Sequence, residues 1–173
     1  MIILETERLL FRPHELGDFE AYCAMEQDPE FRRYVGGAPR TREAAEAKFR
    51  EILRPVRNHL GMWATVLKEN GCYVGRCGIY QHIQTDAVIS GEGVLAFYLA
   101  RFYWGRGLAS EAGSAFVKFG FEELALKKIV ATVQEGNRAS ERVLEKLNFN
   151  LVWKEEGPRT FCHFALLPPE NHL

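Results

Sequence analysis

Residues 101–112 read RFYWGRGLASEA, with glycines at positions 105 and 107. The preceding residues, Val94–Leu99, are all apolar, which predicts a buried strand. The following residues repeat apolar side chains at helical spacing and predict a helix over about residues 108–124. A strand, a glycine loop and a helix start together favour an anion site, most often for phosphate. Free backbone N–H groups and the positive end of the helix dipole meet at such a point.

The loop alone is compatible with more than one structure. The simplest interpretation is an ordinary helix start with helpful glycines. A dinucleotide-binding fold would need G-x-G-x-x-G and an acidic residue about 20 residues later. Gly105 and Gly107 fit that pattern, Ser110 replaces the third glycine, and Glu135 follows a later predicted strand. The choice between these structures therefore depends on other parts of the sequence.

The same loop resembles the pyrophosphate loop of the Gcn5-related N-acetyltransferases (the GNAT superfamily), Gln/Arg-x-x-Gly-x-Gly/Ala, over Trp104–Ala109. The form Trp-Gly-basic-Gly-x-Ala, followed by Glu111 and Ala112, resembles the branch of ribosomal-protein-alanine N-acetyltransferases. Trp104 stands where the wider superfamily has Gln or Arg. The resemblance implies acetyl-CoA as co-substrate, with Arg106 adding a bidentate phosphate contact. It implies these cofactor-binding residues: Leu99, Ala100, Trp104, Gly105, Arg106, Gly107, Leu108, Ala109, Asn137 and Ser140.

A second stretch, residues 137–149, resembles the second acetyl-CoA motif of the same superfamily: Asn-x-x-Ser, a helix, then Leu-x-Phe. By itself, Asn137 is only a good helix N-cap. The family carries Gly where this chain has Asn148, but Asn tolerates the left-handed backbone of a helix C-terminus. The opening residues 4–13 resemble the start of the same branch. A dinucleotide fold has no second match of this kind and needs more βαβ units than the chain supplies.

The pattern of apolar runs and turns predicts an α+β (mixed α/β) fold with helices on both faces of a sheet. Short connections make most of about 6–7 strands antiparallel. The crossover through helix 108–124 makes the strands at 94–99 and 129–133 a parallel pair. The GNAT resemblance implies that this pair is splayed to hold the cofactor. We also expect a polar loop from Gln84 to Gly93, and strand 129–133 to be buried on both faces.

Size and composition favour one domain, residues 1–173, of an ordinary globular protein: 47% of residues are hydrophobic and 26% charged. A formal net charge of −1 gives no electrostatic case for nucleic acid or an anionic membrane. The four cysteines lack disulfide or zinc-finger spacing, so we expect no metal. The chain shows no apolar signal stretch or membrane span, and a reducing cytoplasm is the simplest location.

The resemblance also indicates where an acid and a base would stand. Many relatives use a tyrosine acid where this chain has Leu144, which can donate no proton. Ser140 is the nearest hydroxyl on that helix; it serves as acid or holds the thioester sulfur, or it is a plain first-turn residue.

For the base, relatives often place a Glu where this chain has Val94. Glu92 lies two residues earlier on the same strand face and could act through a water, or it is a solvated loop carboxylate. His82 and His163 are further candidates, although a lone histidine is usually structural.

The implied function is acetyl transfer from acetyl-CoA to a primary amine, by direct transfer in a ternary complex. The acceptor is a protein N-terminal α-amine, or alternatively a small-molecule amine or antibiotic. A third alternative is a non-catalytic acetyl-CoA sensor or scaffold. A site without a tyrosine at 144 and a carboxylate at 94 suits an amine that loses its proton easily. The chain is expected to be a monomer or homodimer.

Overall fold

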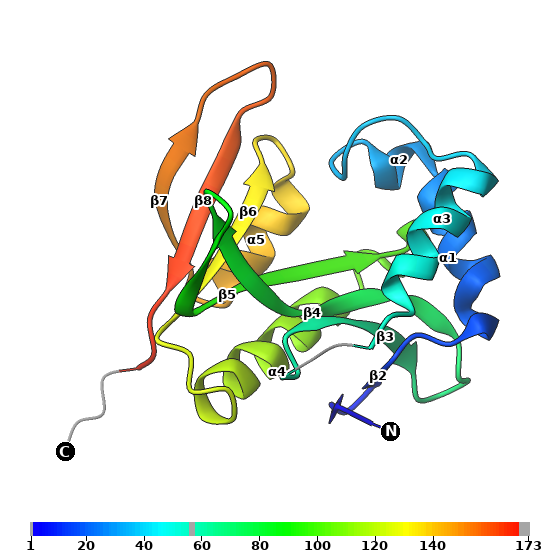
Figure 1. Ribbon diagram of the computed structural model, residues 1–173, viewed down its shortest axis with the longest axis horizontal. Coiled ribbons are helices and arrows are strands. Elements are labelled where there is room, and N and C mark those ends of the chain that lie inside the picture. The colour runs from blue at the N-terminus through cyan, green and yellow to red at the C-terminus, as the bar shows by residue number, and fades with distance from the viewer. Residues whose placement is uncertain (1, 56–57, 170–173) are drawn as a thin grey trace.

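The computed structural model describes residues 2–55 and 58–169. Within them, eight strands form one sheet in the order β1-β2-β3-β4-β5-β6-β8-β7 (Figure 1). The strands are β1 (Leu4–Glu5), β2 (Leu9–Arg12), β3 (Gly61–Leu67), β4 (Tyr73–Gln84), β5 (Ala87–Leu99), β6 (Lys128–Gln134), β7 (Asn150–Glu155) and β8 (Phe161–Leu166). The helices are α1 (Phe19–Gln27), α2 (Pro29–Arg32), α3 (Arg42–Ile52), α4 (Leu108–Glu122) and α5 (Arg138–Lys146), with short 3-10 turns η1 (Leu16–Asp18) and η2 (Arg101–Tyr103).

The predicted α+β class and the mostly antiparallel sheet are confirmed, but the sheet has one strand more than the expected six or seven. The additional strand is β1, whose Leu4 pairs with Phe11 of β2. Two residues are too short to produce a readable alternation of apolar and polar side chains. Sequence periodicity therefore could not detect it.

The expected polar loop from Gln84 to Gly93 is wrong, because these residues belong to a long β4–β5 hairpin. Gln84 pairs with Ala87, and the two turn residues Thr85 and Asp86 have φ angles of 47° and 61°. Positive φ at both central residues is typical of the type I′ turn that matches strand twist. The turn residues are Thr-Asp and not the usual Asn-Gly or Asp-Gly, so no local pattern predicts the hairpin.

The predicted parallel pair is β5 and β6, and it separates partway along its length. The register runs from Glu92↔Lys128 to Val94↔Val130 and then stops. Beyond Val94, strand β5 continues for five residues to Leu99 without β6 beside it. The expectation that β6 is buried on both faces is also wrong, since Thr132 is exposed. Its side chain faces the gap that the divergence opens.

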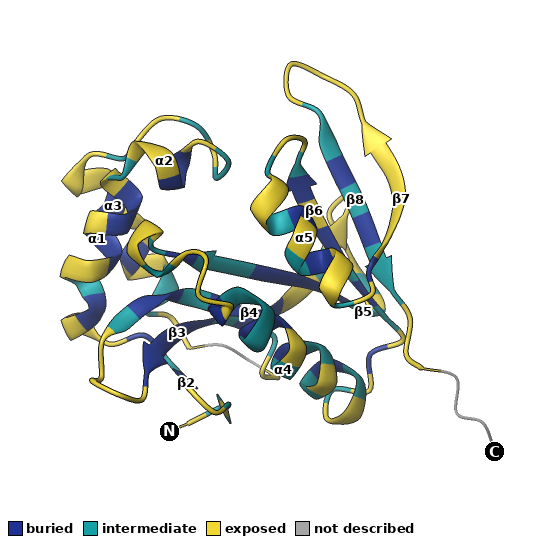
Figure 2. Cartoon of the chain, turned by 180° about the vertical axis from the view of Figure 1, so that it is seen from behind, coloured by how far each residue is buried: buried dark blue, intermediate teal, exposed yellow. Residues whose placement is uncertain are grey.

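Helices cover both faces of the sheet, as predicted. Helices α1, α2 and α3 lie on one face, and α4 and α5 pack against each other on the opposite face (Figures 1 and 2). The main apolar core lies under α4 and α5 and includes Phe116, Ile129 and Leu144. A Cβ on Gly113 would stand 2.6 Å from a methyl group of Leu147, so α4 and α5 approach closely because position 113 has no side chain.

Helix α5 has the two ends that its sequence predicts. The side-chain oxygen of Asn137 accepts a hydrogen bond from the Ser140 N–H at 3.3 Å, which is an N-cap. At the other end, Asn148 has φ 62°, and the Phe149 N–H donates to the Leu144 carbonyl at 3.0 Å. This bond closes the helix in a Schellman motif, with Asn in the position usually held by Gly.

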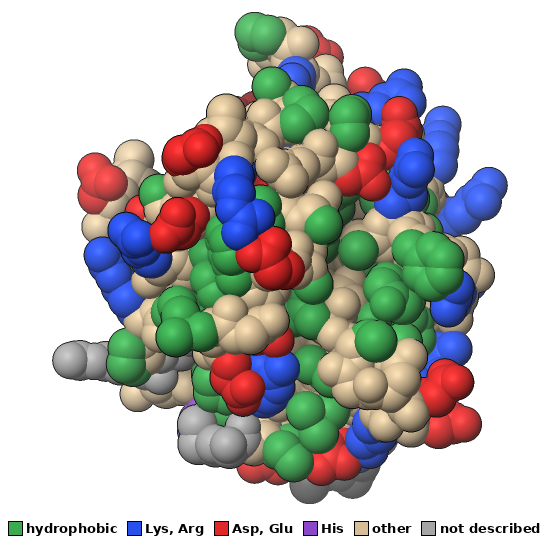
Figure 3. All heavy atoms as spheres, turned by 90° about the vertical axis from the view of Figure 1, so that its right-hand side faces the viewer, with side chains coloured by type: hydrophobic (Ala, Val, Ile, Leu, Met, Phe, Trp, Pro, Cys, Tyr) green, Lys and Arg blue, Asp and Glu red, His purple; other side chains and the backbone are tan. Residues whose placement is uncertain are grey.

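The surface is chemically mixed. Acidic and basic side chains are interspersed on the side of the molecule that carries α1 and α3 (Figure 3), as the net charge of −1 leads one to expect. None of the described helices is long and apolar enough to cross a membrane.

Candidate active site

The glycine loop between η2 and α4 has the backbone of an anion site. Gly105 and Gly107 have φ angles of 73° and 77°, a region that residues with a Cβ enter at a cost. Apart from Gly105 itself and its two neighbours in the chain, no heavy atom of the described residues lies within 4 Å of a Cβ built on Gly105. The loop therefore leaves open space directly in front of the N-terminus of α4, where backbone N–H groups attract an anion.

Residues from the start of the chain hold this loop in place. The guanidinium of Arg8 donates to the Arg106 carbonyl at 2.9 Å and to the Glu111 carboxylate at 2.6 Å. Thr6 donates to the same carboxylate at 2.6 Å. Burial would raise the pKa of Glu111, but these hydrogen bonds outweigh burial and lower the pKa, so Glu111 stays ionised. The N-terminal segment thus fixes the loop without occupying it.

A cleft of about 520 Å³ lies between the loop, the end of β5 and the first turns of α5. Eight of the ten predicted cofactor residues line it: Leu99, Trp104, Gly105, Gly107, Leu108, Ala109, Asn137 and Ser140. The other two, Ala100 and Arg106, do not. The Ala100 N–H donates to the Val74 carbonyl at 2.9 Å, and the Arg106 guanidinium stacks 4.7 Å above the ring of Phe102. We call this cleft the cofactor-side cleft.

The open edge of β5 presents Leu99, which the sequence reasoning singled out, and Phe97, which it did not. Because Ala100 bonds to β4, alternation turns the backbone groups of Phe97 and Leu99 toward the gap beside β6. The Leu99 carbonyl accepts a hydrogen bond from the Trp104 indole at 2.7 Å. Phe97 therefore presents the backbone groups available to an extended ligand. Counting alternate residues along β5 from its pairing with β4 would have identified it.

A row of basic residues also lines the cofactor-side cleft. Arg138, Arg142 and Lys146 follow one another at intervals of four on α5 and are all exposed. Residues at this spacing share one face of a helix, so their charges can meet phosphate groups in the cleft. The spacing was visible in the sequence, but no motif drew attention to it.

A second cavity of about 290 Å³ occupies the gap where β5 and β6 diverge. We call it the acceptor-side cavity. Its walls include Tyr80, Tyr98, Thr132 and Gln134, whose side-chain oxygen is buried without a hydrogen-bond partner among the described residues. Burial raises the pKa of Tyr80 to about 12 and also raises that of Tyr98. Both phenols therefore remain protonated near neutrality and can donate hydrogen bonds.

The two cavities meet at Ser140. They share six lining residues: Tyr34, Val35, Phe97, Tyr98, Asn137 and Ser140. Ser140 is half-buried in the first turn of α5, with its backbone N–H bound by Asn137. Leu144 is fully buried and Val94 is 9% exposed, so these two positions contribute only apolar surface. Tyr34, which lines both cavities, is tied to the turn before α5 because its hydroxyl donates to the Gly136 carbonyl at 3.3 Å.

The structure does not bring Glu92 to either cavity. Its carboxylate binds Lys128 at 2.7 Å and His82 at 2.8 Å, in the part of the sheet where β5 and β6 are still paired. The hydrogen bond from Lys128, with help from His82, holds the pKa of Glu92 below its usual range. A carboxylate stabilised as an anion is a weaker base. Neither Glu92 nor His82 lines the cavities, whereas His163 contacts a residue that does.

Comparisons with known proteins agree with this geometry. A family model described as an acetyltransferase (GNAT) domain matches residues 8–150. The Bacillus licheniformis protein named "Uncharacterized N-acetyltransferase p20" is 30% identical over 154 residues, which cover 86% of this chain and 83% of that protein.

Two solved structures share the fold. An acetyltransferase of the GNAT family from Bacillus anthracis superposes with a TM-score of 0.82 at 24% identity, over 96% of this chain and 98% of that chain. A ribosomal-protein-S5-alanine acetyltransferase from Vibrio fischeri superposes with a TM-score of 0.79 at 15% identity, over 98% of each chain. The chain belongs to the GNAT family and is an acetyltransferase enzyme.

Proposed function

We propose that the chain acts as one N-acetyltransferase domain that moves the acetyl group of acetyl-CoA directly to a primary amine in a ternary complex. The observation that carries the proposal is the meeting of two cavities at Ser140, one beside the anion loop and one in the gap where β5 and β6 diverge. A donor in one cavity and an acceptor in the other would meet at Ser140, beside the point where β5 and β6 separate. Such positioning supplies much of the rate of a two-substrate reaction.

The residues of the cofactor-side cleft fit acetyl-CoA. The N-terminus of α4 and the open space at Gly105 suit the pyrophosphate, and Arg138, Arg142 and Lys146 suit further phosphate charge. The free backbone groups of Phe97 suit the amide groups of the pantetheine arm, and its N–H can polarise a carbonyl. When bound, acetyl-CoA supplies an activated thioester. Asn137 shapes the turn beside it, and Ser140 donates a hydrogen bond to the sulfur.

For the acceptor, we propose an α-amine such as a protein N-terminus. An α-amine has an ordinary pKa of about 8, against about 10.4 for a lysine side chain, so it needs less help to lose its proton. The apolar surfaces of Leu144 and Val94 favour such an acceptor. Membership of the ribosomal-protein-alanine branch belongs to this proposal and rests on the Trp104–Ala109 motif, since the Vibrio fischeri structure supports the fold alone.

A small-molecule amine is the second candidate, favoured by the size of the acceptor-side cavity. Its volume of about 290 Å³ lies at the lower end of the range for small-ligand sites. Such a cavity can hold a small amine or the first residue of a peptide.

The test is release of free thiol from acetyl-CoA in the presence of peptides with free or blocked N-termini and of small amines. We expect acceleration by free α-amines, with Ser140→Ala lowering kcat more than it changes KM for acetyl-CoA, and Asn137→Ala raising that KM. Binding of acetyl-CoA without turnover on any amine would instead support the sensor alternative. Unchanged kinetics in both variants would return Asn137 and Ser140 to a purely structural role.

A further inference from the structure

Three side chains, one from each of β6, β8 and β7, are linked in a row by hydrogen bonds. The Thr132 hydroxyl lies 3.2 Å from Nδ1 of His163, and Nε2 of His163 lies 3.1 Å from the Glu155 carboxylate. Thr132 pairs with His163 across β6 and β8, and His163 pairs with Trp153 across β8 and β7. The three side chains therefore form a row on one face of the sheet.

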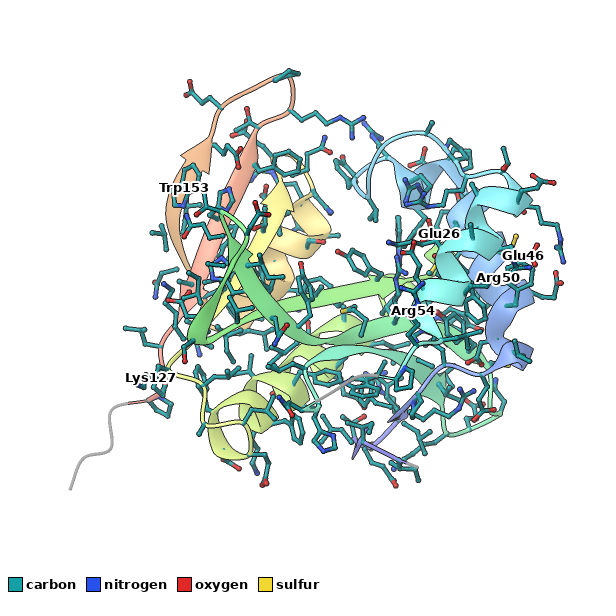
Figure 4. The ribbon with its side chains drawn as sticks, in the orientation of Figure 1. Glu26, Glu46, Arg50, Arg54, Lys127 and Trp153 are labelled. Carbon is teal, nitrogen blue, oxygen red and sulfur yellow. The ribbon has the colours of Figure 1, made fainter. Side chains whose placement is uncertain are left out.

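Chemistry fixes the direction of these hydrogen bonds. An ionised carboxylate only accepts hydrogen bonds, so Nε2 of His163 must carry a proton toward Glu155. In the neutral ring Nδ1 is then an acceptor, and the Thr132 hydroxyl donates to it. The ring of Trp153, which is labelled on β7 in Figure 4, stacks on His163 with the centroids 4.1 Å apart and the planes 2° from parallel. This stacking holds the imidazole in position.

Of the three hydrogen-bonded side chains, only Thr132 reaches the acceptor-side cavity. Thr132 lines that cavity together with Ser140, whereas His163 and Glu155 stand behind it. The side chain of Glu155 is 58% exposed and that of His163 is 24% exposed, so a proton arriving at the imidazole can pass on to water. The apolar positions Val94 and Leu144 of the same cavity can accept no proton.

We propose that Thr132 is the catalytic residue that takes the proton from the acceptor ammonium, with His163 and Glu155 as positioning residues behind it. In the step, the ammonium N–H bond breaks and its proton binds the Thr132 oxygen. The hydroxyl proton of Thr132 moves at the same time to Nδ1 of His163. The products are a neutral amine, a neutral threonine and an imidazolium next to the Glu155 carboxylate. This inference rests on the proposed acetyl transfer to an amine.

The chain offers a matched control in its other histidine–carboxylate pair. His82 lies 2.8 Å from Glu92, somewhat closer than the 3.1 Å between His163 and Glu155, but the Glu92 carboxylate is also bound by Lys128. Neither His82 nor Glu92 lines the cavity. Replacing His82 thus removes an imidazole of the same kind without touching the proposed proton path.

The experiment compares the purified variants Thr132→Val, Thr132→Ser, His163→Gln and His82→Gln by thiol release from acetyl-CoA. A peptide with a free N-terminus is the acceptor, and the assays run at pH 7 and pH 9.5. About a tenth of an α-amine with a pKa of about 8 is already neutral at pH 7, so at this pH we expect Thr132→Val and His163→Gln to lose about 10-fold in kcat, with the KM for acetyl-CoA unchanged. Thr132→Ser should keep most of the rate, and His82→Gln should match the wild type.

The pH dependence separates proton transfer from a structural role. An α-amine is mostly neutral at pH 9.5, so the deficit of Thr132→Val and His163→Gln should shrink there. A deficit equal at both pH values, or equal losses in Thr132→Ser and Thr132→Val, would overturn the proposal. Melting with acetyl-CoA checks the fold of each variant. If Thr132→Val disturbs the fold of β6, the rate of His163→Gln tests the proposal instead, because His163 lies on β8.

Failure of the relay and failure of the proposed function give different results. If the wild type releases no thiol with any amine, the proposed function fails. If the wild type turns over and both Thr132→Val and His163→Gln match it at pH 7, the relay alone is refuted.

Discussion

The two faces of the sheet are stabilised by different means. The face under α4 and α5 packs a continuous apolar core, and its anion loop comes from one contiguous stretch of sequence. The face under α1, α2 and α3 has a smaller apolar cluster around Tyr22 and Phe49. That face also contains most of the buried polar and charged side chains, namely His14, Asp18, Glu26 and Arg32.

This difference separates a face that forms the anion loop from a face that holds buried charges. The cofactor-side face depends on backbone geometry at two glycines and on apolar packing, so few substitutions are compatible with it. The face with α1 to α3 depends on buried charges whose strength changes with pH and with single substitutions. We therefore expect mutations on the first face to change ligand binding, and mutations on the second to change stability.

The largest expected effect comes from Glu26 on the charged face. Its carboxylate is fully buried and binds Arg32 and Arg40 at 2.9 Å and Arg76 at 3.0 Å. Glu26→Gln would leave buried guanidinium groups without a counter-charge, which typically costs about 3–5 kcal/mol. Urea unfolding at pH 7 measures the loss. A cost within error of zero would show that this cluster does not stabilise the face.

Glu46 supplies the control for that substitution. It lies on α3 beside its partner Arg50 (Figure 4). Both side chains are about half or more exposed. Exposed ion pairs contribute little, because water already screens both charges. Glu46→Gln makes the same chemical change as Glu26→Gln and should leave the free energy of unfolding unchanged within error.

The second prediction concerns a substitution in the anion loop of the cofactor-side face. Gly105→Val places a branched side chain where the pyrophosphate would lie, so acetyl-CoA should no longer raise the melting temperature. At 100 times its Kd, a ligand stabilises the folded state by about 2.7 kcal/mol, and this gain should be lost. Differential scanning calorimetry with acetyl-CoA and with NADH measures it. A shift with NADH and none with acetyl-CoA in the wild type would contradict the cofactor assignment.

Gly71 supplies the control position for the Gly105→Val substitution. Its φ is 72°, close to the 73° of Gly105, and a Cβ built there has open space around it. It lies in the β3–β4 turn, away from the cofactor-side cleft. Gly71→Val should therefore carry the same backbone strain as Gly105→Val but keep the acetyl-CoA shift. Loss of the shift in both variants would mean that strain, and not blocked space, abolishes binding.

A smaller effect is expected from His14 on the charged face. Burial lowers its pKa from 6.5 to about 4, and the nearby Arg76 and Arg12 act in the same direction against Asp18. Between pH 6.5 and pH 4, His14 is protonated in the unfolded chain but neutral in the folded chain. The free energy of unfolding therefore falls as the pH drops below 6.5. At pH 5 the cost is about 2 kcal/mol. The difference in unfolding free energy between pH 7.5 and pH 5 should be smaller by this amount in His14→Gln. Equal differences in both proteins would contradict it.

The sequence predicted those features that depend on local backbone chemistry. Gly105, Gly107 and Asn148 stand where a left-handed backbone is required, and each could be placed by counting from a helix end. Asn137 caps α5 for the same local reason. Eight of the ten predicted cofactor residues line one cleft because they belong to two short contiguous motifs.

Features that depend on pairing between distant strands could not be predicted in the same way. Glu92 was placed near the reaction by its distance from Val94 along one strand, but its surroundings depend on Lys128 of the neighbouring strand. Thr132 reaches the acceptor-side cavity only because β5 and β6 separate after Val94. Its contact with His163 requires the register of β6 on β8, which no local pattern encodes.

The most direct test of the account is an internal competition between two amines. A peptide with a free N-terminal alanine and one internal lysine is incubated with the enzyme and acetyl-CoA, and fragmentation mass spectrometry locates the acetyl group. We predict acetylation mainly on the α-amine at pH 7, because that amine loses its proton more easily. Acetyl groups found mainly on the lysine side chain, with the α-amine unmodified, would contradict the account.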